Sequence, residues 1–198
     1  MSLLTIKDLT IAHVGPISLE LKPGEIVCLS GASGSGKSLM LRAIADIIPA
    51  GGTLSLGEIK STEVVAPVWR RQVALLPAES QWWHDTVGEH FKLPDLTLFQ
   101  QLGFASDCLS WQTSRCSTGE KQRLALLRLL ANKPECLLLD EPTGSLDPDS
   151  TLTVEALLKT LATQQQIPML WVSHSHEQIK RVADRHFVMC DGQLVAYE

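Results

Sequence analysis

The eight residues from 31 to 38 restrict the fold of this chain more than any other segment. They are Gly31, Ala32, Ser33, Gly34, Ser35, Gly36, Lys37 and Ser38, and they fit the pattern G-x-x-x-x-G-K-S. Residues 26–29 before them predict a buried strand, and residues 37–48 predict a helix. In this setting the backbone N–H groups of the loop face phosphate oxygens, Lys37 neutralises the β- and γ-phosphates, and the Ser38 hydroxyl binds Mg²⁺. The segment therefore predicts a nucleotide phosphate site, with a chance Gly/Ser loop as the alternative.

Two acids follow a second apolar run, at residues 136–139. A buried strand that ends in Asp140 and Glu141 places both carboxylates at the carboxyl edge of a sheet, where open α/β folds bind ligands. Asp140 is suited to hold Mg²⁺ through its hydration shell, and Glu141 to orient and polarise an attacking water. The alternative, a strand that ends in solvated acids, loses weight because the phosphate loop lies upstream.

Strands alternate with helices along the rest of the chain, which predicts an α/β fold with a mostly parallel core sheet. Residues 3–29 predict an N-terminal antiparallel β region, and residues 78–115 a small helical subdomain. The expected further strands are 53–57, 73–76, 137–139 and 169–172, the expected helices 120–132, 151–165 and 177–183, and the expected closing hairpin 186–195. Residues 1–198 then form a single domain, in which 1–77 and 116–198 make the core and β region.

The composition of the chain restricts the kinds of partner and the cellular compartment that we expect. The formal net charge of -5 is unlike the basic excess of most nucleic-acid-binding proteins, so we expect no nucleic acid partner. Neither a secretory signal nor an apolar run long enough to span a bilayer is visible, which predicts a soluble protein; any membrane role would come through a partner chain. The 5 cysteines form no CxxC pair, and buried free thiols in a reducing, cytoplasmic compartment explain them.

A third segment indicates which class of P-loop nucleotidase this chain belongs to. It spans residues 114–123, Ser-Arg-Cys-Ser-Thr-Gly-Glu-Lys-Gln-Arg. They resemble the signature of ABC ATPases, Leu-Ser-Gly-Gly-Gln followed by a Lys/Arg-Gln-Arg helix. Ser117 and Gly119 match that signature, whereas Cys116, Thr118 and Glu120 depart from it. A helix start at Ser117 offers a second phosphate cradle, which implies a second subunit facing the phosphate loop of the first. The alternative is an ordinary N-cap, in which Ser117 and Glu120 form a capping box.

Three further segments resemble the same family and extend the likeness over nearly the whole chain. Residues 142–147 resemble the D-loop and end in Asp147, His174 occupies the position of the switch histidine, and residues 188–194 resemble the terminal hairpin. The resemblance implies a P-loop NTPase fold with Walker A and Walker B motifs, ATP and Mg²⁺ as ligands, and Lys37, Glu141 and His174 in catalysis. It also implies a head-to-tail homodimer that drives integral membrane permease subunits, located in the cytoplasm on the inner face of the cell membrane.

The chain departs from the family at several positions. Ala78 stands where the family has a glutamine, which predicts slower or differently coupled hydrolysis. His13 stands where an aromatic side chain stacks on adenine, and a surface loop residue is the alternative. Adjacent Trp82 and Trp83 cannot both face one core from a helix or a strand, so one is expected to be exposed or to contact the membrane partner. The alternative is a compact aromatic core of the small subdomain.

The brevity of the chain, residues 85–87 (Asp-Thr-Val) and residues 170–174 (Leu-Trp-Val-Ser-His) resemble a group of small iron-export or metal-resistance ATPases. The other functions considered are a non-transport ABC protein, a regulatory ATP-binding module with little turnover, and a small-molecule kinase.

Overall fold

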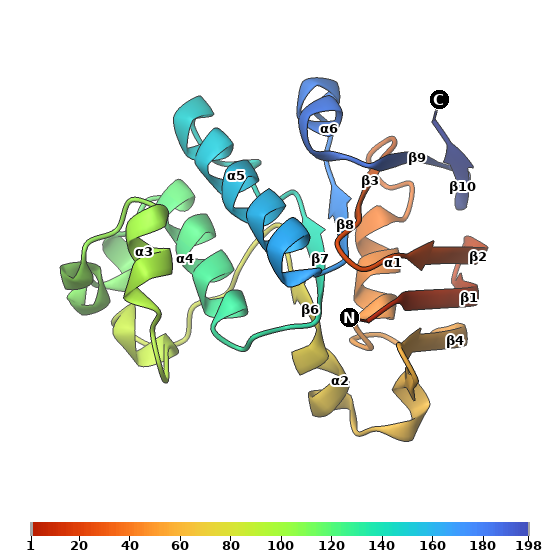
Figure 1. Cartoon of the computed structure of the whole chain (residues 1–198), viewed down its shortest axis with the longest axis horizontal. Coiled ribbons are helices and arrows are strands. Elements are labelled where there is room, and N and C mark those ends of the chain that lie inside the picture. The colour runs from red at the N-terminus through yellow and green to blue at the C-terminus, as the bar shows by residue number, and fades with distance from the viewer. Residues whose placement is uncertain (1, 198) are drawn as a thin grey trace.

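The computed structural model describes residues 2–197, which form an α/β fold with two sheets (Figure 1). Within these residues the larger sheet has 6 strands in the order β10-β9-β3-β8-β7-β6, and the smaller sheet has 4 in the order β2-β1-β4-β5. In the larger sheet β9, β3, β8, β7 and β6 run parallel, and β10 returns antiparallel to β9. The expected mostly parallel core sheet and the expected N-terminal antiparallel region are both confirmed.

The smaller sheet buries one face, because its strands alternate apolar and polar residues. It consists of β1 (Leu4–Ile11), β2 (Val14–Leu21), β4 (Gly51–Leu56) and the short β5 (Ile59–Lys60). The buried residues of these strands share one apolar cluster with helix α1 (Lys37–Ile44) and with one face of the larger sheet. Helix α1 therefore lies between the two sheets (Figure 1).

Helix α1 ends four residues before the expected boundary at residue 48. Ala45 leaves the helical conformation, and Asp46 takes a left-handed φ of 56°, which stops the helix. The buried indole of Trp69 caps the turn by donating a hydrogen bond to the carbonyl of Ile44 at 2.8 Å. Trp69 belongs to helix α2 (Ala66–Gln72), so a later element contacts the end of α1.

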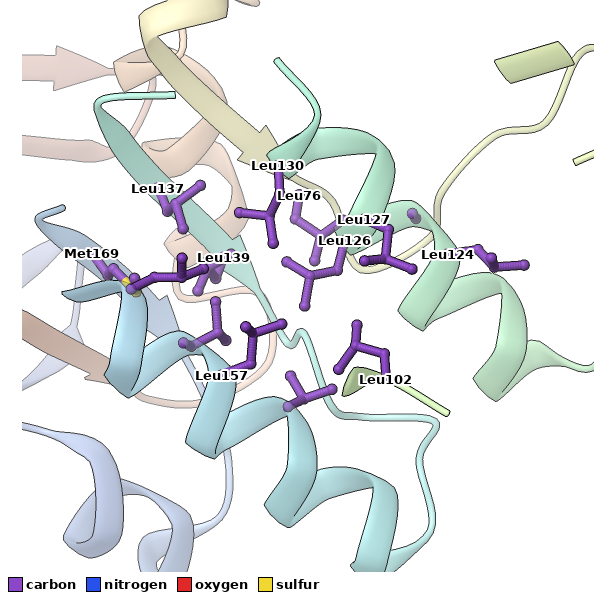
Figure 2. Packing of buried hydrophobic residues seen from close by; sticks show 14 of the residues in the cluster. Leu76, Leu102, Leu124, Leu126, Leu127, Leu130, Leu137, Leu139, Leu157 and Met169 are labelled. Atoms are coloured by element: carbon purple, nitrogen blue, oxygen red, sulfur yellow. The ribbon is translucent and has the colours of Figure 1, made fainter. Parts of the chain in front are cut away.

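The central strands of the larger sheet are buried on both faces. Its strands are β3 (Ile26–Ser30), β6 (Val73–Leu76), β7 (Cys136–Asp140), β8 (Met169–Val172), β9 (Arg185–Cys190) and β10 (Gln193–Ala196). On β7, Leu138 packs with the α1 cluster, whereas Leu137 and Leu139 face helices α4 (Thr118–Leu130) and α5 (Pro148–Gln165). Figure 2 shows that second face, where leucines of α4 and α5 close over the strand. The sheet is thus the middle layer of three.

The segment 78–115 contains less α-helix than expected. Its one α-helix within the described residues is α3 (Leu96–Gln101). The segment also contains three short 3-10 helices, Gly88–His90 before α3 and Ser106–Ser110 and Thr113–Arg115 after it. The segment packs its aromatic side chains against α4 instead, with Phe91, Phe99 and Phe104 all buried. Pro94 and the positive φ of Gly103 interrupt regular helix on either side of α3.

Other helix boundaries also shift by one to three residues. Helix α5 begins at Pro148 rather than 151, because Asp147 accepts a hydrogen bond from the backbone N–H of Ser150 and Pro148 suits the first helical position. Helix α6 spans His176–Val182, and the closing hairpin turns at Asp191 and Gly192, as predicted. No helix among residues 2–197 combines the length and the apolar character that crossing a membrane requires.

Candidate functional site

The predicted site residues converge at the carboxyl ends of three neighbouring strands, β3, β8 and β7. Leu29 pairs with Val172, and Val172 pairs with Asp140, so the three strands end at the same level. The phosphate loop leaves β3 there, Glu141 follows β7, and His174 follows β8. Parallel register therefore brings together side chains that lie more than a hundred residues apart in the sequence.

The phosphate loop holds its shape through glycines that other residues cannot replace. Gly36 adopts a φ of 107°, and a Cβ there would overlap the side chain of Val14. At Gly31 a Cβ would overlap the carbonyl oxygen of Met189. Ala32, Ser33 and Gly34, at the tip of the loop, are exposed, while Ser35 and Ser38 are half-buried.

Lys37 points into the phosphate loop that precedes its own helix. Its side chain is 6% exposed, and Nζ donates hydrogen bonds of 2.8 Å each to the carbonyls of Gly31 and Ala32. Burial lowers the pKa of Lys37, while the carboxylates of Glu141 and Asp140 act in the opposite direction. A buried ammonium group bound to neutral carbonyls is well placed to exchange them for phosphate oxygens.

Glu141 and His174 are in direct contact. Glu141 Oε1 lies 3.1 Å from His174 Nε2, and the two side chains are 41% and 50% exposed. Glu141 has a left-handed φ of 51°, uncommon for a residue with a side chain, and its backbone N–H donates to the carbonyl of Val172 at 3.2 Å. The pair forms a carboxylate–imidazole arrangement that can position and deprotonate a water molecule.

Asp140 and Ser38 are the residues suited to Mg²⁺. Asp140 is the last residue of β7 and is 5% exposed, and Ser38 is the second residue of α1. Both supply oxygen atoms, the ligands that Mg²⁺ prefers, and a cation bound this way keeps water and phosphate oxygens as further ligands. The donor chemistry therefore fits the predicted ion.

Ser117 and Gly119 do not join this cluster within one chain. Ser117 caps α4 in a complete capping box: its Oγ accepts from the backbone N–H of Glu120, and its own N–H donates to Glu120 Oε2 at 2.8 Å. Gly119 packs on the loop after β7, since a Cβ there would lie 3.1 Å from the carbonyl oxygen of Ser145. Within residues 2–197, no hydrogen bond joins Ser117 or Gly119 to the phosphate loop. The capping box explains the Ser/Glu spacing in the sequence, and it leaves the exposed Ser117 at the molecular surface.

His13 and Ala78 flank the site. His13 is exposed in the turn between β1 and β2, next to Val14, whose side chain contacts Gly36. Ala78 is exposed two residues beyond β6, whose last residue pairs with Leu139, so Ala78 leaves the sheet at the level of Glu141. A methyl group at this position offers neither a donor nor an acceptor to water or metal.

A buried polar network beneath His174 escaped the sequence analysis. Ser173 Oγ donates to Gln178 Oε1 at 2.8 Å, and Gln178 Nε2 donates to Thr143 Oγ1 at 2.8 Å and to Glu155 Oε1 at 2.9 Å. Arg181 completes the network with two hydrogen bonds to the Glu155 carboxylate. The network ties the loop that carries His174 to the loop after Glu141. These residues come from four separate segments of the chain, so no local spacing in the sequence predicts their contact.

Comparison with known proteins agrees with this geometry. The ABC transporter family model matches residues 14–144. The aliphatic sulfonates import ATP-binding protein SsuB 3 of Nocardia farcinica is 37% identical over 183 residues, covering 90% of this chain and 71% of that protein. ABC transporter I family member 17 of Arabidopsis thaliana is 36% identical over 192 residues, covering 90% and 73%. The chain belongs to the ABC transporter family. Membership makes it an ATP-binding and ATP-hydrolysing protein of the transporter class.

A solved structure supports the fold of this ABC ATPase over 98% of the chain. The dimeric ATP-binding cassette MJ0796, in a post-hydrolysis state bound to ADP and Pi, superposes with a TM-score of 0.84 at 21% identity, and the match covers 98% of each chain. At that identity the likeness establishes the fold. The family membership of this ABC ATPase rests on the closer sequence relatives.

Proposed function

We propose that this ABC ATPase works as a head-to-tail dimer of two copies, each completing the nucleotide site of the other. The observation that carries the proposal is the exposure of the reacting groups. Glu141 and His174 are 41% and 50% exposed, and the tip of the phosphate loop is open to solvent. Phosphoryl transfer depends on electrostatic stabilisation in a site that excludes bulk water. A second copy that presents its exposed Ser117 and half-buried Gly119 would cover the γ-phosphate and close the site.

Within each site the residues divide the work as follows. Lys37 and the backbone N–H groups of residues 31–38 bind the phosphates and neutralise their charge. Glu141 orients and polarises water for in-line attack, and His174 holds Glu141 and contacts the γ-phosphate. His13, beside the loop, stacks on the adenine ring. Mg²⁺, held by Ser38 and Asp140, would offset the charge on the β- and γ-phosphate oxygens.

ATP hydrolysis changes how tightly the two copies hold each other, because the γ-phosphate is the group shared between them. Closure with ATP and reopening with ADP would move integral membrane subunits by differential affinity of the two states. This requires the chain to sit on the cytoplasmic face of the cell membrane. The resemblance to small iron-export ATPases stays a prediction.

Trp83 marks the surface for the membrane subunit. Its side chain is 65% exposed, whereas Trp82 packs against the hydrophobic core. Both rings stack on the guanidinium of Arg128, at 4.5 Å for Trp82 and 4.7 Å for Trp83. An exposed indole held rigidly by a cation is a ready contact for a partner. We therefore propose that residues 78–115, the segment that carries Trp83, form the unit that receives the membrane subunit.

The ATPase rate of the native protein and of Glu141→Gln tests the catalytic part of the proposal. The glutamine keeps the size of the side chain and removes its basicity, so we expect the rate to fall by at least about 100-fold while ATP binding persists. Equal and negligible rates for both proteins would favour a second candidate, a regulatory ATP-binding module with little turnover. The exposed Ala78, which cannot contact water or metal, is the observation that favours that candidate.

The docking surface is tested with single tryptophan variants. Trp83→Ala should abolish co-purification with the membrane subunit and spare both folding and ATP binding. Arg128→Met serves as the matched control for the stacking, since it removes the cation beneath the ring and keeps Trp83 itself. Loss of folding in Trp83→Ala, or undiminished partner binding, would contradict the assignment.

A further inference from the structure

Gln122 bridges the two ends of the loop that follows strand β7. Its side chain is buried on the inner face of α4, 9% exposed. Nε2 donates a hydrogen bond of 2.7 Å to the carbonyl of Glu141, and Oε1 accepts one of 3.0 Å from the backbone N–H of Ser145. Donor meets acceptor at both ends, which fixes the orientation of the amide.

The Glu141 end of this bridge lies at a strained position. Glu141 is held at a φ of 51°, and its carbonyl accepts hydrogen bonds from Gln122 and from the backbone N–H of Gly144 at 3.1 Å. A left-handed non-glycine residue persists when its surroundings fix it in place. The Gln122 amide therefore contributes to the backbone conformation from which the Glu141 side chain reaches His174.

The same helix also begins at the surface that the partner copy is proposed to meet. Gln122 lies in the second turn of α4, which Ser117 caps and whose first turn contains Gly119. Gly119 packs on the carbonyl of Ser145, so the start of α4 and the loop after Glu141 are in contact at two places. A displacement of the helix start reaches Glu141 through few intermediate atoms.

We infer that Gln122 is a positioning residue that couples the two nucleotide sites of the dimer. When the first turn of α4 engages nucleotide bound to the partner copy, Gln122 transmits the movement to Glu141 of its own site. The inference rests on the proposed head-to-tail dimer and adds to it a route by which one site senses the other. Coupling of this kind requires two sites and a contact that both of them bias, and Gln122 supplies the contact.

Two substitutions separate the ends of the bridge. Gln122→Met keeps the length of the side chain and removes both hydrogen bonds. Gln122→Glu keeps an acceptor for the Ser145 N–H and loses the donor to the Glu141 carbonyl. Arg123→Met is the matched control, because Arg123 is the next residue and anchors α4 on its other side, to the carbonyl of Leu102 at 2.8 Å. Urea unfolding confirms that each protein is folded.

The readouts are the Mg-ATP concentration that drives dimer formation, kcat, and the Hill coefficient for ATP hydrolysis. We expect the native protein to hydrolyse ATP cooperatively. Both Gln122 variants should dimerise at native Mg-ATP concentrations, lose about tenfold or more in kcat, and show a Hill coefficient near ~1. Arg123→Met should keep the native Hill coefficient.

Each contrary result has a separate meaning. Native kcat and cooperativity in Gln122→Met or in Gln122→Glu would overturn the inference, as would a native Hill coefficient of ~1. It is also overturned if Arg123→Met loses cooperativity equally, or if kcat falls only because dimers no longer form. Failure of the native protein to dimerise with Mg-ATP would instead defeat the proposed dimer itself.

Discussion

Replacing Arg181 with methionine should destabilise the fold, because it leaves the buried carboxylate of Glu155 without its positively charged partner. The Glu155 side chain is 5% exposed, and its carboxylate receives hydrogen bonds from Arg181 Nε at 2.9 Å and Arg181 Nη2 at 2.7 Å. Removing one partner of a buried ion pair costs about 3–5 kcal/mol, because the other charge remains buried. The Arg181 side chain is 42% exposed, so solvent screens part of this interaction. We therefore expect a loss of about 2 kcal/mol in the free energy of unfolding, or a fall in Tm of about 4–8 °C.

The pH dependence of this loss has a definite sign. Burial, the largest single influence, acts to raise the pKa of Glu155, but the hydrogen bonds from Arg181 and Gln178 together hold that pKa below its usual value of 4.5. A carboxyl group with a depressed folded-state pKa stabilises the fold above its unfolded pKa and loses that contribution as the pH falls through the folded value. The stability gap between native protein and Arg181→Met should thus be widest near neutral pH and narrow below pH 4.5.

Urea unfolding at several pH values measures both effects, and Lys180→Met is the matched control. Lys180 precedes Arg181 in the last turn of α6, and within residues 2–197 it takes part in no ion pair. The two substitutions remove the same charge from the same helix end, so any difference between them reports the Glu155 contact. Equal stability of Arg181→Met and Lys180→Met at neutral pH would refute the reasoning.

Three further predictions concern the site and the thiols. Lys37→Met should weaken ATP binding by about 10- to 100-fold in a calorimetric titration, since it removes a charge-assisted contact to phosphate; unchanged affinity would contradict the placement of its ammonium group. Ala78→Gln should raise kcat by about tenfold, because a side-chain amide regains a contact to water or metal; an unaltered rate would show that position 78 does not limit turnover. Ellman's reagent should label one thiol of the folded protein, Cys190, because the other cysteines in residues 2–197 are buried. Burial also raises the pKa of Cys28 to about 12 and that of Cys108 to about 11, which keeps these thiols protonated. Labelling of two or more thiols would contradict this prediction.

The phosphate-binding site at the carboxyl edge of the sheet can be predicted from the sequence, because phosphate binding requires contiguous residues of fixed type. Local sequence patterns identify residues 31–38 and the pair Asp140 and Glu141. The parallel sheet that brings them together follows from the alternation of strands and helices. His174 was placed by family resemblance, and the structure puts its ring against Glu141.

The features that the sequence concealed depend on contacts between distant segments. At the end of helix α1, the Ile44 carbonyl accepts a hydrogen bond from Trp69, which lies 25 positions away. Gln122 and Gln178 resemble ordinary helix-surface glutamines in the sequence, yet both are buried and each bridges to a loop at least 19 positions away. Local periodicity contains no information about such partners.

The dimer is tested most directly by energy transfer between two separately labelled batches of the protein, in a Cys190→Ser, Glu141→Gln background that slows hydrolysis. One batch carries a donor at Arg42→Cys, in the last turn of α1, the helix that follows the phosphate loop. The other carries an acceptor at Arg115→Cys, two residues before Ser117, and both positions are exposed. Each chain carries one dye, so transfer reports contact between copies. We predict that Mg-ATP produces strong transfer and that adding Lys37→Met to the donor batch reduces it. Nucleotide binding without any transfer would contradict a site shared by two copies.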